Sequence, residues 1–199
     1  MKYSNCKIEK KIILQAVLYL TIVCFCIILS LSGKSGNDKR KQVFFYNTQL
    51  TGDKGVVIKI IDGDTYDLLI KDKTTIRVRM NGIDAPERGQ PFYQKSKDFL
   101  GQLCFQKNIR IVRTGKDRYG RVIAGSYLED GTSLSYEMVK NGFAWHFKKY
   151  SADTVLSRLE TNAKKQRLGL WFDKTPVAPW STRAQRKKER RIMKSNQAS

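Results

Sequence analysis

Apolar and polar residues alternate along several short stretches in the middle of the chain, and this alternation predicts β-strands. The stretches span residues 56–61, 66–70, 75–80, 109–112 and 121–128. In TIRVRM (75–80) the apolar residues occupy every second position, so Arg77 and Arg79 point to the opposite face. The Asp-Gly pair in DGDT (62–65) lies between the first two stretches and predicts a hairpin.

Three further segments carry apolar residues at helical spacing and predict helices over 91–104, 133–142 and 151–169. Pro91 is expected in the first turn of the first helix, Asn-Gly (141–142) ends the second, and Gly169 ends the third. Strands and helices together fill residues 54–180, and they predict a small α+β domain or a partly open barrel.

The N-terminal part has a different pattern. Residues 12–31 are almost wholly apolar and follow several lysines, which is typical of a signal peptide or a membrane anchor over 1–31. Residues 32–53 are rich in Ser, Gly, Lys and Asn and read as a linker. We expect an exported protein, extracellular, periplasmic or held at the membrane by residues 12–31 if that segment is not cleaved.

The net charge of the chain indicates which classes of binding partner it attracts. The chain has 38 Lys and Arg against 18 Asp and Glu, a net charge of +20, which favours nucleic acid first and anionic lipid second. Residues 181–199 add a basic tail, expected as a solvated or frayed helical segment with non-specific polyanion contact as a secondary role. His146 is the only histidine, so a Cys/His zinc cluster is excluded, and we expect it at the surface.

Against this basic background, acidic residues stand at the ends of apolar runs: Asp62, Asp64, Asp84 and Glu87. Each one alone is an ordinary turn residue. Two such carboxylates brought together repel unless a cation lies between them, and oxygen ligands select a hard cation such as Ca²⁺ or Mg²⁺. Arg79 and Arg121 could bind phosphate oxygens, and Glu87 could activate a water molecule.

The motifs IDGDT (61–65), RMNGIDAPE (79–87) and DRYGR (117–121) occur in this order, followed by NGFAW, RLGLWFD and PVAPW. This ordered set resembles the staphylococcal (micrococcal) nuclease or thermonuclease family over residues 54–180. The resemblance implies an OB-fold, a mainly β five-stranded Greek-key barrel with about three packed helices, here preceded by a hydrophobic N-terminal helix. It also implies Ca²⁺-dependent hydrolysis of phosphodiester bonds in DNA and RNA, with Mg²⁺ or Mn²⁺ as possible substitutes.

The resemblance also implies roles for particular residues. Asp64 and Asp84 match the metal-binding carboxylates, and the backbone carbonyl of Ala85 matches a further metal ligand. Asp62 matches an acid that supports these ligands without binding the metal. The catalytic roles fall to the phosphate-binding Arg79 and Arg121 and to Glu87 as general base.

Other positions match the substrate-binding part of the family motif. Arg118 stands where a lysine contacts a terminal phosphate, and Tyr119 matches a tyrosine of the base pocket. Trp145 and Phe147 replace tyrosines, so stacking on a base is retained whereas Phe147 has no hydroxyl for a phosphate.

Two other roles use the same fold: a non-catalytic nucleic-acid-binding module, and a membrane-tethered receptor for DNA uptake. The presence of Asp64, Asp84, Glu87, Arg79 and Arg121 favours the enzyme. Nothing in the sequence implies a protein partner, and we expect a monomer.

Overall fold

The computed structural model describes residues 52–197. The predicted N-terminal segment (1–31) and nearly all of the predicted linker (32–53) lie outside the described residues, so the expectations for them stay predictions. Within residues 52–197, no helix combines the length and the apolar character needed to cross a membrane.

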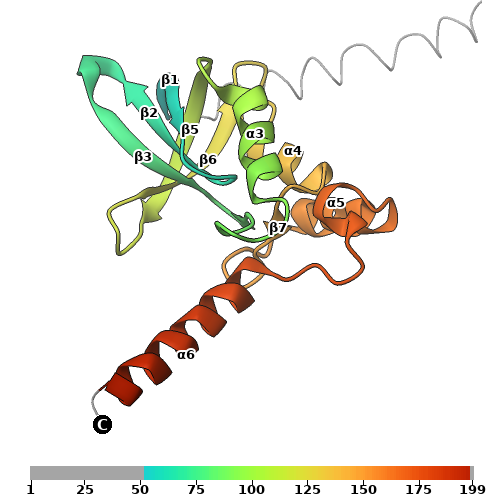
Figure 1. Ribbon diagram of the computed structural model, residues 1–199. Coiled ribbons are helices and arrows are strands. Elements are labelled where there is room, and N and C mark those ends of the chain that lie inside the picture. The colour runs from blue at the N-terminus through green and yellow to red at the C-terminus, as the bar shows by residue number, and fades with distance from the viewer. Residues whose placement is uncertain (1–51, 198–199) are drawn as a thin grey trace, which may run out of the picture. The chain divides into compact units, whose positions relative to one another are not determined.

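A closed five-stranded barrel forms the centre of the domain (Figure 1), with strand order β1-β2-β3-β6-β5. The barrel strands are β1 (Asp53–Ile60), β2 (Thr65–Ile70), β3 (Thr75–Met80), β5 (Asn108–Lys116) and β6 (Val122–Leu128). Neighbouring strands are antiparallel except β3 and β6, which are parallel, and the pairing of β1 with β5 closes the barrel. The predicted five-stranded Greek-key barrel is confirmed, although β1 and β5 are longer than the alternation alone indicated.

The helices that cover the barrel are α3 (Tyr93–Cys104), α4 (Leu134–Lys140) and α5 (Thr154–Lys165). Helix α3 contacts β1, α4 contacts β6, and α5 packs on α4. The first helix begins at Tyr93 and not at Pro91, because Phe92 adopts a left-handed backbone with φ of 64°. Asp153 sets the start of α5 by accepting hydrogen bonds from the amides of Val155 and Leu156. Short 3-10 turns follow β2 (Lys71–Lys73) and α5 (Gly169–Phe172).

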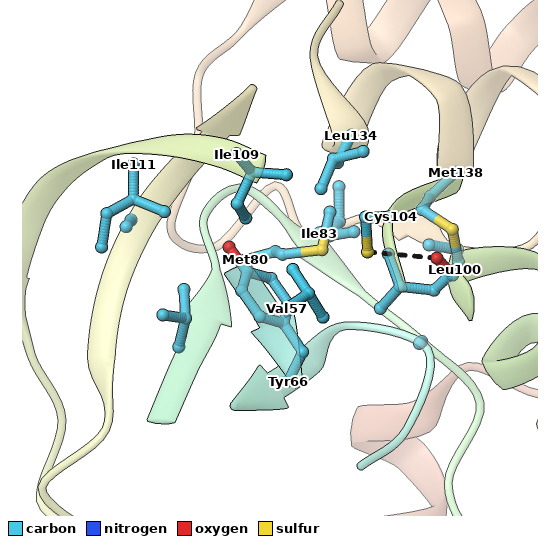
Figure 2. Packing of buried hydrophobic residues seen from close by; sticks show 14 of the residues in the cluster. Val57, Tyr66, Met80, Ile83, Leu100, Cys104, Ile109, Ile111, Leu134 and Met138 are labelled. Carbon is cyan, nitrogen blue, oxygen red and sulfur yellow. Dashed lines mark hydrogen bonds between the residues drawn. The ribbon is translucent and has the colours of Figure 1, made fainter. Parts of the chain in front are cut away.

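The core fills the barrel and continues under the helices (Figure 2). Val57, Tyr66 and Met80 project from the strands towards Leu100 of α3 and Leu134 and Met138 of α4, all of them almost fully buried. The buried hydroxyl of Tyr66 is hydrogen-bonded to Ser126 Oγ at 2.7 Å, so its burial leaves no polar atom unpaired. Cys104 is a buried thiol in the same core, and burial raises its pKa to about 12.

Two further elements shape the site. The short strands β4 (Ile83–Asp84) and β7 (Trp145–His146) pair with each other outside the barrel and place Asp84 opposite Trp145. The predicted tail forms a long helix, α6 (Pro179–Gln197), which crosses the expected boundary at residue 180. Residues 187–197 of α6 are exposed, but the first turns of the helix contact the domain.

Candidate active site

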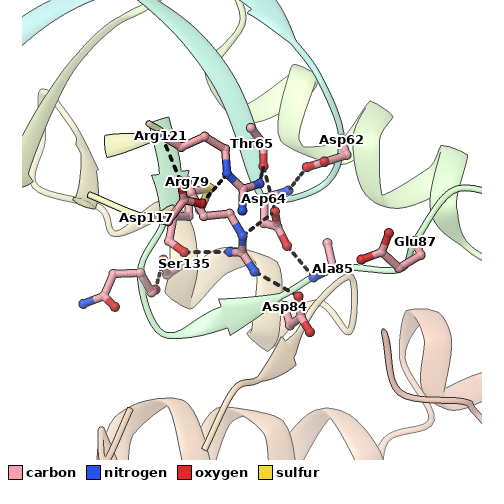
Figure 3. Close-up of polar contacts among 12 residues, drawn as sticks. Asp62, Asp64, Thr65, Arg79, Asp84, Ala85, Glu87, Asp117, Arg121 and Ser135 are labelled. Atoms are coloured by element: carbon pink, nitrogen blue, oxygen red, sulfur yellow. Dashed lines mark hydrogen bonds and ion pairs between the residues drawn. The ribbon is translucent and has the colours of Figure 1, made fainter. Parts of the chain in front are cut away.

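Four separate segments bring Asp64, Arg79, Asp84 and Arg121 together (Figure 3). Asp64 ends the hairpin turn before β2, Arg79 lies in β3, Asp84 ends β4, and Arg121 immediately precedes β6. The β2–β3 register pairs Thr65 with Arg79, and the Met80 amide donates to the Asp64 carbonyl at 2.8 Å. The barrel register therefore fixes the acidic turn beside the arginine.

Arg79 bridges the two aspartates that the sequence singled out. Its Nε lies 3.1 Å from Asp64 Oδ1, and its Nη2 donates to Asp84 Oδ1 at 2.9 Å. The Asp64 and Asp84 side chains are 7% and 2% exposed, so both carboxylates are held away from bulk water. The close approach of two buried carboxylates is thus offset by a guanidinium group.

Backbone and side-chain donors fix the orientation of Asp64. Its Oδ2 accepts from the Ala85 amide at 2.6 Å, and its Oδ1 accepts from the Thr65 hydroxyl at 3.0 Å. Asp62 in turn accepts from the Asp64 amide at 3.0 Å. Burial, reinforced by the neighbouring Asp64 charge, raises the pKa of Asp62 to about 7. Asp62 therefore supports the turn and titrates near neutral pH.

Arg121 is oriented by an acid that sequence reasoning did not single out. Its Nε donates to Asp117 Oδ2 at 2.7 Å, and its Nη1 lies 3.5 Å from Thr65 Oγ1. The pKa of Asp117 is lowered. Partial burial alone would raise this pKa, but hydrogen bonds from the Arg121 side chain and from the amides of Tyr119 and Arg121 outweigh that effect. Asp117 therefore stays charged and holds the guanidinium of Arg121 close to the Asp64 turn.

Asp84 and Glu87 share a second guanidinium, that of Arg183 in α6. Arg183 Nη2 donates to Asp84 Oδ2 at 2.6 Å and its Nη1 to Asp84 Oδ1 at 3.1 Å. The same Nη1 also donates to Glu87 Oε1. Burial raises the pKa of Asp84, although the hydrogen bond from Arg183 opposes that shift. Arg183 is one of seven basic residues in 181–199, and no local signal distinguished it from the others.

These side chains line one open cavity of about 800 Å³. Its wall includes the acids Asp62, Asp64, Asp84 and Glu87 and the arginines Arg79, Arg121 and Arg183. Carboxylates and guanidinium groups thus face the same space. Such an arrangement can bind a hard cation and a phosphate side by side.

Two of the expected substrate-binding residues, Arg118 and Tyr119, also line this cavity. Both lie in the DRYG turn, and Tyr119 is 69% exposed. Arg118 Nη2 donates to the Tyr119 hydroxyl at 2.6 Å and the guanidinium lies over the ring, 4.8 Å from its centre. The pair forms an exposed cationic and aromatic edge at the rim.

The other two expected substrate-binding residues occupy different surroundings. Phe147 lines the cavity, and the ring of Trp180 stacks on it with 5.2 Å between ring centres and an angle of 1°. Trp145 lies against Trp171 and Trp180, with ring centres 4.3 and 5.5 Å away. It lines a neighbouring hollow of about 640 Å³. Phe147 therefore lines both hollows and faces the candidate substrate space, whereas Trp145 lines only the neighbouring hollow.

The expectation that His146 lies at the surface is wrong, because the residue is only 2% exposed. Its Nε2 and Nδ1 lie 3.1 and 3.0 Å from the hydroxyls of Ser151 and Ser157. Burial lowers its pKa. His146 is therefore a buried residue whose two ring nitrogens both have hydrogen-bond partners, and the side-chain alternation of β7 turns it inward.

The oxygen donors fit a hard divalent cation. Asp64 Oδ2 and Asp84 Oδ2 each accept one hydrogen bond from the described residues, so each retains a free lone pair. Ala85 is buried and tied to Asp64 through its amide. Within residues 52–197 no cluster of three or more acidic, histidine or cysteine side chains is arranged as a metal cage. A cation here would therefore need backbone, water or phosphate oxygens besides the two carboxylates.

Residues 77–173 match the family model described as "Staphylococcal nuclease homologue". An uncharacterized endonuclease of Haemophilus influenzae is 46% identical over 131 residues, which cover 66% of this chain and 73% of the relative. An uncharacterized endonuclease of Escherichia coli is 37% identical over 126 residues, 63% of this chain and 82% of the relative.

A micrococcal nuclease of Shigella flexneri is 36% identical over 140 residues, which cover 65% of this chain and 80% of the relative. The family-model match covers most of the barrel strand with Arg79, the DAPE and DRYGR turns and the helices α3 to α5. The barrel, the convergence of acids and arginines, and the matched sequence agree with one another. The chain belongs to the staphylococcal nuclease family.

Proposed function

We propose that this protein is a Ca²⁺-dependent endonuclease that hydrolyses phosphodiester bonds in both DNA and RNA. The observation that carries the proposal is the position of Arg79 between buried Asp64 and Asp84, with Arg121 facing the same cavity. The relatives named as endonucleases and as a micrococcal nuclease support the same reaction.

Asp64, Asp84 and the carbonyl of Ala85 would hold the cation, with Asp62 supporting the turn. When bound, a divalent cation would supply Lewis-acid polarisation of the phosphoryl group and help orient water. The donors are all oxygens, which favours Ca²⁺ and also admits Mg²⁺ or Mn²⁺.

Arg79 and Arg121 would stabilise the charge that accumulates on the phosphoryl oxygens during attack. Both guanidinium groups are fixed before substrate arrives, Arg79 by two aspartates and Arg121 by Asp117. A preorganised donor of this kind costs little reorganisation in the transition state. Because guanidinium groups are planar and offer parallel donors, two phosphoryl oxygens can be bound at once.

Glu87 would take a proton from the attacking water. As the water oxygen bonds to phosphorus, the P–O bond to the leaving oxygen breaks; that oxygen takes a proton from solvent water, and Glu87 later releases its own proton to solvent. The Glu87 side chain is 30% exposed and faces the cavity, so water can reach it. Its position fits a general base, which must lie within hydrogen-bond reach of the water.

The cavity offers charge and ring faces to a substrate. Arg118 can contact phosphate and the rings of Tyr119 and Phe147 can stack on bases, which favours cleavage without base preference. The net charge of +20 draws polyanions towards the domain. We further propose an exported monomer, held at the membrane if residues 12–31 remain uncleaved.

The test is cleavage by the purified full chain in detergent, with plasmid DNA or RNA and with Ca²⁺, Mg²⁺ or EDTA. We expect Ca²⁺-dependent degradation that EDTA abolishes and that Asp64→Ala reduces by about a thousandfold or more. Glu129→Gln, which removes an exposed acid outside the cavity, is the control and should cleave normally. Cleavage that survives EDTA would refute the metal requirement, and nucleic acid that is bound but never shortened would identify a binding module.

A further inference from the structure

The start of α6 contacts residues 84–90, which include the candidate metal ligand Asp84 and the candidate general base Glu87. Loop 84–90 and residues 177–186 are linked at three places along their length. Gln90 Nε2 donates to the Val177 carbonyl at 2.9 Å, and Arg186 Nη2 donates to the Arg88 carbonyl at 2.6 Å. Between these contacts, Arg183 binds the side chains of Asp84 and Glu87.

The Arg183 contact differs from an ordinary surface ion pair. Its guanidinium binds both carboxylate oxygens of Asp84, at 2.6 and 3.1 Å, and one nitrogen is shared with Glu87. The Asp84 side chain is only 2% exposed. A planar fork that binds two acids fixes their relative orientation, which a single flexible charge does not.

Trp180 fixes the helix that carries Arg183. The residue lies three positions before Arg183, so both side chains can project from the same side of α6. Trp180 packs against Phe147 and Trp145, and Trp145 is the strand partner of Asp84. The aromatic cluster and the acidic loop therefore set the position of the guanidinium from two sides.

We propose that Arg183 is a positioning residue for phosphodiester hydrolysis, supplied by α6. The inference rests on the proposed nuclease function. Arg183 acts through Glu87, whose carboxylate it aims into the cavity, and through Asp84, which it holds together with Arg79. Without it, Glu87 loses this side-chain partner and samples orientations from which it cannot reach the attacking water.

The experiment compares Arg183→Gln and Arg183→Lys with the full-length wild type and with Arg158→Gln. Arg158 is an exposed arginine of α5, so its variant removes the same charge away from the cavity. We expect kcat of Arg183→Gln to fall about 10- to 100-fold with KM within about twofold, because misplaced catalytic groups slow the chemical step. Arg183→Lys keeps the positive charge without the planar pair of donors, so its kcat should lie between those of Arg183→Gln and wild type. Arg158→Gln should have the kcat of wild type.

A second measurement does not depend on turnover. Amide hydrogen exchange across residues 84–90 should be faster in Arg183→Gln than in wild type, while exchange in the barrel strands stays unchanged. If Arg183→Gln unfolds at the assay temperature, amide exchange across residues 84–90 is compared between Arg183→Lys and wild type instead.

Two results would overturn the inference. Unchanged kcat and exchange in Arg183→Gln would make the contact incidental. A higher kcat with tighter Ca²⁺ binding would instead make Arg183 a competitor of the cation. An inactive wild type would reject the proposed function itself, so the two failures are distinguishable.

Discussion

Asp62 is a residue whose acid–base behaviour depends on its surroundings. In the folded protein its pKa is about 7, raised from 3.8 by burial and by Asp64. Between these two pH values the folded state keeps a proton that the unfolded chain releases. Stability attributable to Asp62 therefore decreases as the pH rises from about 4 to 7.

Asp62→Asn should remove this dependence while keeping an oxygen that can accept from the Asp64 amide. In EDTA we expect the variant and the wild type to have equal melting temperatures near pH 4. At pH 8 the free energy of unfolding of the variant should be higher by about 1–3 kcal/mol, a range that is reduced because the Asp62 side chain is partly exposed. Added Ca²⁺ should shrink the difference, because a cation lowers the pKa of a nearby acid. A stability difference between variant and wild type that is the same at every pH would contradict the raised pKa of Asp62.

Substitution of Arg121 tests whether catalysis needs a guanidinium group held in a fixed orientation at the rim of the site. Arg121→Lys keeps the charge but loses the fork that Asp117 orients. We expect kcat to fall about 100-fold or more with an unchanged melting temperature, as when a preorganised donor is removed. Arg113→Lys, which alters an exposed pair with Asp53, is the matched control. Equal activity of the two variants would exclude a catalytic role for Arg121.

At the scale of elements, a close backbone contact joins the end of α4 to the end of α5. Gly142 has φ of 71°, and a Cβ there would lie 2.2 Å from the Leu168 carbonyl oxygen. The Leu170 amide donates to the Gly142 carbonyl at 2.8 Å. The Asn-Gly that ends the helix in sequence is therefore also a packing site between segments.

Gly142→Ala should destabilise the domain by about 2–5 kcal/mol, from left-handed strain and from the clash with residue 168. Denaturant unfolding measures this difference. Gly131→Ala is the control, because Gly131 also has a positive φ of 88° but its added Cβ would meet no atom within 4 Å. It should show the strain alone, about 1 kcal/mol. Equal losses in both variants would mean that the close contact is unimportant.

At the scale of the whole molecule, the charge of +20 governs encounter with a polyanion. Neutralised phosphates release counterions, so binding weakens as salt rises. For the Asp64→Ala variant we expect duplex affinity to fall about 10- to 100-fold between roughly 50 and 200 mM salt, with similar slopes for DNA and RNA. Fluorescence anisotropy measures the slope, with sucrose at matched osmolality as the control. A flat dependence would contradict phosphate-led binding.

The amino-acid pattern was enough to predict the barrel strands, the hairpin turn and, of the residues around the cavity, Asp64, Arg79, Asp84, Glu87 and Arg121. These features are local: alternation assigns residues such as Arg79 to a face, and Asp-Gly sets a turn. The ordered motifs then indicated the family. The start of α3 does not follow from the sequence pattern, since the left-handed backbone of Phe92 delays the helix without any local signal.

Contacts between side chains that are distant in sequence depend on the tertiary structure. Arg183 lies 99 residues beyond Asp84, and no periodicity or turn connects two such positions. The burial of His146 and the stacking of Trp180 on Phe147 likewise depend on where β7 and α6 pack. Local patterns specify an element and its faces, whereas contacts between elements depend on the path of the whole chain.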